Sequence, residues 1–122
     1  MNPTVSKFVS TLFSSREQAH IFHLQTNSFA THKALQNYYE DIVDLVDTYV
    51  EMYQGRYEII TGYTVTPQFY EGDDEVTKYF TGLAKYVDSV RGSLPENTDL
   101  NNVVDEISGL INSTVYKLRF LK

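Results

Sequence analysis

The chain of 122 residues contains no cysteine, and this absence restricts the chemistry that it can perform. Disulfide bonds, thiol nucleophiles and thiolate metal ligands are all excluded. Any transition-metal site would therefore be built from histidine and carboxylate side chains. No internal repeat, low-complexity tract or linker-like stretch divides the chain either, so we expect a single domain over residues 1–122.

Long apolar runs and basic clusters are also missing. No stretch of about eighteen apolar residues is present, and the first residues do not resemble a signal peptide, so we expect a cytoplasmic protein without a membrane span. The formal net charge is -6, and the one short basic stretch is the ending YKLRFLK. This balance argues against a nucleic-acid partner. The basic ending is typical of the last turn of a helix, where cations complement the helix dipole.

Apolar residues recur at helical spacing along most of the chain, which predicts an all-α fold. Asn2 and Pro3 are typical of a helix start, as are the acidic residues at 73–75, and Gly92 is typical of a helix end. The predicted helices cover about residues 2–26, 28–55, 73–91 and 98–122.

The segment between the second and third helices is rich in β-branched and aromatic residues and is interrupted by Gly62 and Pro67. It is therefore predicted to be an extended connection, with a short strand as an alternative. Extended, it would reach on the order of 50 Å, longer than the second helix at about 40 Å. The turns at 26–28 and 93–97 are short enough for antiparallel hairpins. The sequence thus predicts a ferritin-like four-helix bundle, with two antiparallel hairpins joined by a long crossover.

All three histidines lie in the stretch QAHIFHLQTNSFATHK, residues 18–33. If the turn is centred near residue 26, His20 lies level with His32 across the hairpin, and His23 lies closer to the loop. Two imidazoles that meet in this way can bind a metal ion. The structural alternative is that these histidines cap or pack the ends of the two helices.

The second helix adds Gln36, Asp47 and Glu51 in a band that flanks its apolar face. Asp47 and Glu51 are spaced by four residues and could hold one ion between them. Glu40 and Asp44 are interpreted as part of a solvated acidic stripe.

His32 and Asp47 are about 22 Å apart along one helix, so they cannot share an ion within one chain. A two-fold dimer with antiparallel second helices, centred near residues 41–42, removes this obstacle. His32 of one subunit would then face Glu51 of the other, and Gln36 would face Asp47.

The segments QAH (18–20), NSFATH (27–32) and DLVDTYVE (44–51) resemble the second-helix region of the Dps-type miniferritins. The resemblance implies ferroxidase ligands from two subunits of a homo-oligomer, with His20 and His32 as the histidine ligands, Asp47 from the partner subunit and Glu51 bridging. Two positions depart from the pattern. Gln36 replaces an aspartate ligand, and Ile21 replaces a tryptophan. The short, tyrosine-rich chain also resembles small ferritin-like proteins of tailed phages.

Three functions follow as hypotheses. The first is an iron-binding ferroxidase with its site at His20, His32, Asp47, Glu51 and Gln36. The second is a non-catalytic ferritin-like structural or interaction protein, cytoplasmic or virion-associated, in which the histidines are buried hydrogen-bonding residues. The third is zinc binding at His20, His23 and His32 without oxidation.

Overall fold

The computed structural model describes residues 2–68 and 72–122, and this part of the chain is all-helical. The long helices are α1 (Pro3–Gln25), α2 (Phe29–Arg56), α3 (Asp73–Val90) and α4 (Thr98–Phe120), and a short 3-10 turn, η1 (Arg91–Ser93), follows α3. No strand is assigned in the described residues, so the predicted all-α class is confirmed. Residues 69–71 of the predicted extended connection lie outside the described part.

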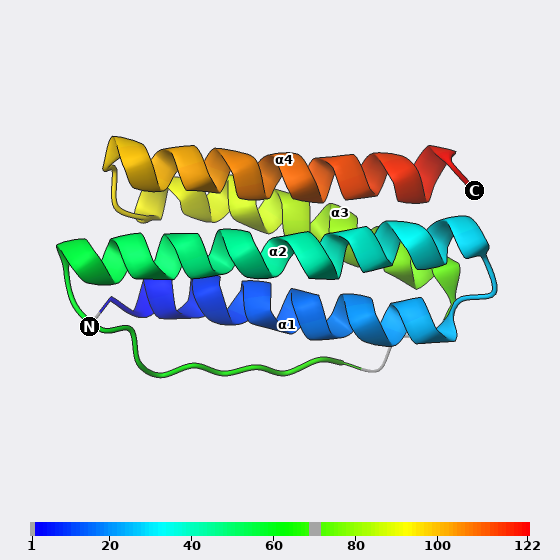
Figure 1. The fold of residues 1–122 in the computed structure, drawn as a ribbon, viewed down its shortest axis with the longest axis horizontal. Helices are drawn as coiled ribbons and strands as arrows, with labels where there is room; N and C mark the ends of the chain where they lie inside the picture. The colour runs from blue at the N-terminus through cyan, green and yellow to red at the C-terminus, as the bar shows by residue number, and fades with distance from the viewer. Residues whose placement is uncertain (1, 69–71) are drawn as a thin grey trace.

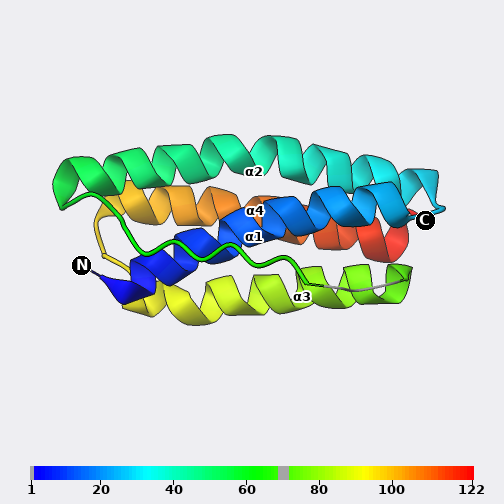
Figure 2. The same cartoon turned by 90° about the horizontal axis from the view of Figure 1, so that it is seen from below.

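The chain reverses direction at each short turn and at both ends of the long connection, so α2 and α3 run in the same direction (Figure 1). It runs along α1, returns along α2, crosses back beside α1 as an extended segment, and then follows α3 and α4. The helix α2 packs against α1 and α4, and α4 also packs against α3, whereas α1 and α3 make few contacts. Figure 2 shows α2 and α3 on opposite sides of the bundle, with α1 and α4 between them.

Side chains cap the starts of α1 and α2, and Asn2 is the one that the sequence predicts at a helix start. The Asn2 Oδ1 atom accepts hydrogen bonds from the backbone N–H groups of Thr4 and Val5, at 3.0 and 3.2 Å. The Ser28 hydroxyl accepts one from the N–H of Thr31 at 3.2 Å. These side chains satisfy N–H groups that have no partner within their helices, which explains why the sequence located these starts to within a residue or two.

Aromatic side chains from three helices form the centre of the core. The ring of Phe8 on α1 meets that of Tyr49 on α2 edge-on at 5.3 Å between centroids, and Tyr38 on α2 meets Phe80 on α3 at 4.8 Å. The hydroxyl of Tyr38 is satisfied by the hydroxyl of Ser15, 2.6 Å away. All these side chains are inaccessible to solvent, so the core fixes the position of α2 on which the candidate site depends.

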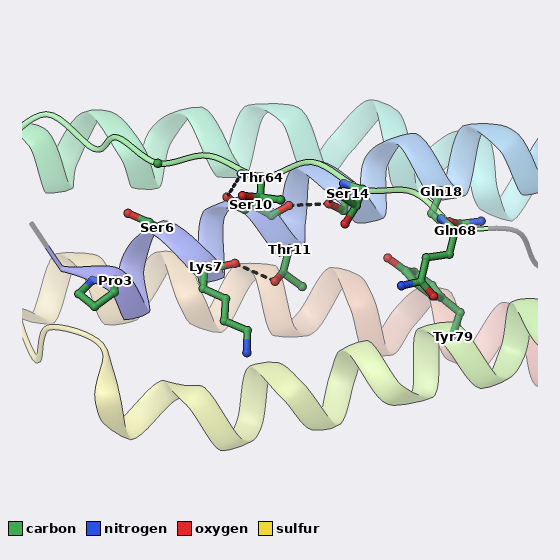
Figure 3. Close-up of a pocket in the computed structure, with 12 residues that line it drawn as sticks. Pro3, Ser6, Lys7, Ser10, Thr11, Ser14, Gln18, Thr64, Gln68 and Tyr79 are labelled. Atoms are coloured by element: carbon green, nitrogen blue, oxygen red, sulfur yellow. Dashed lines mark hydrogen bonds between the residues drawn. The ribbon is translucent and has the colours of Figure 1, made fainter.

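The extended connection is attached to α1 by a series of hydrogen bonds, part of which is drawn in Figure 3. These are Ser6 Oγ to the Thr61 carbonyl (2.8 Å), Thr64 N–H to Ser10 Oγ (3.0 Å), Thr66 N–H to Ser14 Oγ (3.1 Å) and Gln68 N–H to Gln18 Oε1 (2.8 Å). Four residues of a helix, slightly more than one turn, rise about 6 Å, and two extended residues rise about 6.6 Å. The two repeats match, so each turn of α1 can hold one backbone group of the connection.

Removing this series at two positions is expected to loosen the connection without unfolding the bundle. In the variant Ser10→Ala/Ser14→Ala, the N–H groups of Thr64 and Thr66 lose their acceptors, so their hydrogen exchange should accelerate at least about tenfold. Global stability should change by only about 1 kcal/mol, because alanine favours the helix and partly offsets the lost bonds. Exchange measured by NMR at each amide is the test.

The matched control is Thr11→Ala, because the Thr11 hydroxyl donates to the Lys7 carbonyl within α1 at 2.7 Å. Its removal should leave exchange of the connection unchanged. Unaltered exchange at Thr64 and Thr66 in the double variant would show that the serine hydroxyls do not hold the connection.

Candidate functional site

Two of the three histidines close the turn between α1 and α2. The rings of His23 and His32 stack with centroids 3.6 Å apart and planes 21° from parallel. The His23 Nδ1 atom lies 2.8 Å from the His32 carbonyl oxygen, and the His32 Nδ1 atom lies 2.8 Å from the His23 carbonyl oxygen. Because a carbonyl oxygen only accepts, both Nδ1 atoms donate. We call this reciprocal pair the histidine clasp.

The predicted pairing of His20 with His32 is wrong by one helical turn, because it is His23 that lies opposite His32. Thr26 and Ser28 are extended residues that flank the turn, with ψ of 147° and 120°, and they move its centre beyond residue 26. Shifting the centre by about one and a half residues changes the partner of His32 by three, which is one turn of α1. His20 stacks instead on Tyr39, with ring centroids 4.7 Å apart.

The tautomer of the clasp leaves the other ring nitrogen available. With Nδ1 donating, the Nε2 atom of a neutral imidazole is an acceptor. Metal-binding histidines are commonly oriented in this way, by a hydrogen bond from the nitrogen that does not bind the metal. His23 is buried, His32 is half-buried and His20 is exposed, so His20 and His32 are the histidines that solvent reaches.

The predicted carboxylate ligands lie on the solvent-exposed side of α2, away from the clasp. Asp47 and Glu51 are both exposed, as are Glu40 and Asp44. Gln36 is half-buried, and its Nε2 atom donates to Glu40 Oε1 at 3.0 Å. Gln36, which stands where the Dps-type pattern has an aspartate ligand, therefore contacts a neighbouring carboxylate on its own helix.

Within residues 2–68 and 72–122, no group of three histidine, aspartate or glutamate side chains is arranged to hold a metal ion. His20, His23 and His32 do not form a single-chain zinc site in this part of the chain. A site that combines His20 and His32 with Asp47 and Glu51 would need a second copy of the protein, because His32 and Asp47 are about 22 Å apart along one helix.

A groove beside the extended connection was not predicted from the sequence. It has a volume of about 480 Å³ and lies between α1, the connection and α3, where serine and threonine hydroxyls line it (Figure 3). The buried Nε2 atom of Gln18 has no hydrogen-bond partner among the residues that the structure describes. The pattern that could have revealed this surface is the repeat of polar residues every four positions at Ser6, Ser10, Ser14 and Gln18.

None of the described helices combines the length and the apolar character needed to cross a membrane.

Comparison with known proteins gives a family and one phage relative. Residues 23–118 match a family of unknown function (DUF5856). The matched region includes both histidines of the clasp and leaves His20 outside. The chain is also similar to an uncharacterized 14.6 kDa protein of the mobD-ri intergenic region of Enterobacteria phage T4. The identity is 23% over 113 residues, which cover 92% of this chain and 85% of the phage protein. No solved structure matches the chain.

Proposed function

The chain belongs to the family of unknown function DUF5856, and we propose that it is a non-catalytic, ferritin-like interaction protein of phage type that acts by binding other protein surfaces. The observation that carries this proposal is the histidine clasp. His23 and His32 satisfy each other's Nδ1 donors and backbone carbonyls and cover each other's ring faces. Closing the turn is a sufficient role for both side chains, so their presence does not require a metal ion.

The ferritin-like part of the proposal is supported by the long connection. It leaves the end of α2 and follows α1 along the bundle before α3 begins, while the other two connections are short (Figure 1). This order of short, long and short connections is the one that ferritin-like bundles use. The similarity to a phage T4 protein supports a phage source, with a virion or the cytoplasm of an infected cell as the proposed location.

A second candidate is the intersubunit ferroxidase, with ferrous iron as its substrate. It is favoured by the free Nε2 atom of His32 and by the exposure of Asp47 and Glu51, one turn apart on α2. Iron bound between two copies would be held by imidazole and carboxylate ligands, which suit it. This arrangement brings the exposed carboxylates of two α2 helices together, so it would form only with the cation bound.

Thermal unfolding with and without ferrous iron under anaerobic conditions separates the two candidates. For the interaction protein, we expect iron to leave Tm unchanged and ferrous oxidation in air to proceed at the rate of buffer. For the ferroxidase, iron at about 100 times its Kd would stabilise the fold by about 2.7 kcal/mol, on the order of 10 °C in Tm. A metal-dependent rise in Tm that disappears in His20→Ala and Glu51→Gln would overturn the proposed function.

A variant of the clasp provides the matched control. His23→Leu keeps the approximate volume but removes the stacked ring and the hydrogen bond from His23 Nδ1 to the His32 carbonyl, while the backbone carbonyl at position 23 can still accept from His32 Nδ1. We expect the free energy of unfolding to fall by about 1–3 kcal/mol with or without iron. His20→Ala should change stability by much less, because His20 is exposed.

A further inference from the structure

Four of the ten lysine and arginine residues line one groove of the molecule. The groove has a volume of about 620 Å³ and lies between α3 and the end of α4. Its basic residues are Lys78, Lys85, Arg119 and Lys122, and the acidic residue that lines it is Asp74. We call this surface the basic groove. Lys78 lies 3.5 Å from Glu75, while Lys85 has no ion pair among the described residues, so positive charge remains available there.

The opposite side of the bundle carries the complementary charge. Five exposed carboxylates lie on α2, and none of them forms a salt bridge within the described residues. They are Glu40, Asp41, Asp44, Asp47 and Glu51. We call this surface the acidic face. The helices α2 and α3 lie on opposite sides of the bundle (Figure 2), so the acidic face and the basic groove point away from each other and cannot neutralise each other within one chain.

The charges on the two surfaces have the same spacing. Lys78 and Lys85 are seven residues apart on α3, about 10.5 Å along two helical turns. Asp44 and Glu51 are also seven residues apart on α2, as are Glu40 and Asp47. Residues at this spacing lie on the same side of a helix. A helix α2 laid along the basic groove can therefore place two carboxylates beside two lysines at once.

Two further features of the basic groove suit a helix as the occupant. Gly82 lies between the two lysines, and a side chain added there would meet no atom within 4 Å. Glycine inside a helix costs about 1 kcal/mol relative to alanine, while it lets another backbone approach closely. Phe120 at the groove is 63% exposed, with the Arg119 guanidinium 4.9 Å from its ring centroid. An exposed aromatic and an arginine are typical anchors of protein interfaces.

From these observations we propose that the basic groove of one copy binds the acidic face of a second copy, head to tail. This inference rests on the proposed role as an interaction protein and names the partner. Because the two surfaces differ, the contact is heterologous and can be repeated to build a ring or a filament. The alternative two-fold contact would place two acidic faces against each other, where like charges repel.

The proposed contact should be sensitive to salt. Each exposed ion pair contributes only about 0–1 kcal/mol, but several pairs act together in this contact. Salt screens exposed charges over about 8 Å at physiological ionic strength, and over shorter distances at higher salt. In sedimentation velocity, we expect the wild-type chain to self-associate at low salt, with an apparent Kd at least about tenfold weaker at 0.5 M salt.

Charge reversal at Lys85 tests the groove. Lys85→Glu should weaken self-association at low salt by at least about tenfold. The matched control is Lys7→Glu, which makes the same change of charge at an exposed position of α1 and should retain wild-type association. Self-association that survives Lys85→Glu would overturn the head-to-tail contact, and so would a wild-type chain that stays monomeric at low salt.

A mixing experiment identifies the two partner surfaces. Asp44→Lys should also weaken self-association by itself. An equimolar mixture of the two variants combines the intact basic groove of Asp44→Lys with the intact acidic face of Lys85→Glu. We therefore expect the mixture to form at least a heterodimer. Absence of rescue would overturn the proposed pairing of surfaces. Self-association in this experiment is measured without iron. Failure of the head-to-tail contact is therefore distinguishable from failure of the proposed function, which is tested by Tm with ferrous iron.

Discussion

Replacing Phe80 by alanine is expected to lower the free energy of unfolding by about 3–5 kcal/mol. The Phe80 side chain is inaccessible to solvent, and its ring meets those of Tyr38 and Tyr79 edge-on at 4.8 and 5.4 Å. Alanine would remove the ring contact with Tyr38 and leave a cavity in a close-packed interior. A loss of this size is a large part of the total stability of a domain of this length.

Urea denaturation followed by circular dichroism measures this loss. The matched control is Phe120→Ala, because the Phe120 side chain is 63% exposed and should contribute less than about 0.5 kcal/mol to folding. Equal effects of the two substitutions would show that Phe80 is not buried against Tyr38 as described. The same control separates folding from assembly, since Phe120 lies in the basic groove and its loss should weaken self-association.

The helices could be predicted because their signals are local. Asn2 and Ser28 cap helices through hydrogen bonds to N–H groups two or three residues away, and apolar residues at helical spacing mark the buried side. The fold class and the element boundaries therefore follow from short stretches of sequence. The ferritin-like interpretation needs the path of the whole chain, which such stretches do not determine.

The register of the histidines could not be predicted because it depends on the backbone of the turn. A change of one or two residues in the centre of the turn exchanges His20 for His23 as the residue opposite His32. The two extended residues that flank the turn, Thr26 and Ser28, produce this change. Spacing along the chain located the histidine cluster, while the identity of the stacked pair required the backbone conformation.

The extended connection illustrates a pattern that could have been recognised. Serine inside a helix is usually neutral or unfavourable, and a run at four-residue spacing forms one polar stripe. Ser6 and Ser10 are nevertheless buried and Ser14 is half-buried, which apolar periodicity does not predict. The positions of these hydroxyls are explained by the connection, because each bonds a backbone group of the segment that covers it.

The two candidate assemblies compete for one surface. The ferroxidase site would use Asp47 and Glu51 against a second α2, and the head-to-tail contact uses the same acidic face against the basic groove. A copy cannot make both contacts at that face. If ferrous iron stabilised the two-fold dimer, it would therefore inhibit head-to-tail association. The sedimentation experiment repeated with iron would then show weaker head-to-tail association.

Alkaline pH is expected to unfold the protein steeply above about pH 10. Burial raises the pKa of Tyr49 to about 12, and burial also raises the pKa of Tyr38 far above its usual value. In the unfolded chain both hydroxyls titrate near the ordinary tyrosine pKa of about 10. Between pH 10 and 12 the unfolded state therefore binds fewer protons than the folded state, so stability falls as pH rises. A difference of two bound protons lowers the free energy of unfolding by about 2.7 kcal/mol per pH unit.

Tyr49→Phe separates this linkage from general alkaline damage. The buried Tyr49 hydroxyl has no hydrogen-bond partner in the described part of the chain, so its removal should leave stability at pH 7 unchanged or slightly higher. Above pH 10, urea denaturation should show that the free energy of unfolding falls less steeply with pH than in the wild type. The difference in slope should be about 1.4 kcal/mol per pH unit, which corresponds to one proton. Tyr116→Phe changes a tyrosine that is 53% exposed and should retain the wild-type slope. A slope that is the same in all three proteins would contradict burial of the Tyr49 hydroxyl, and with it the packing of α2 against α1.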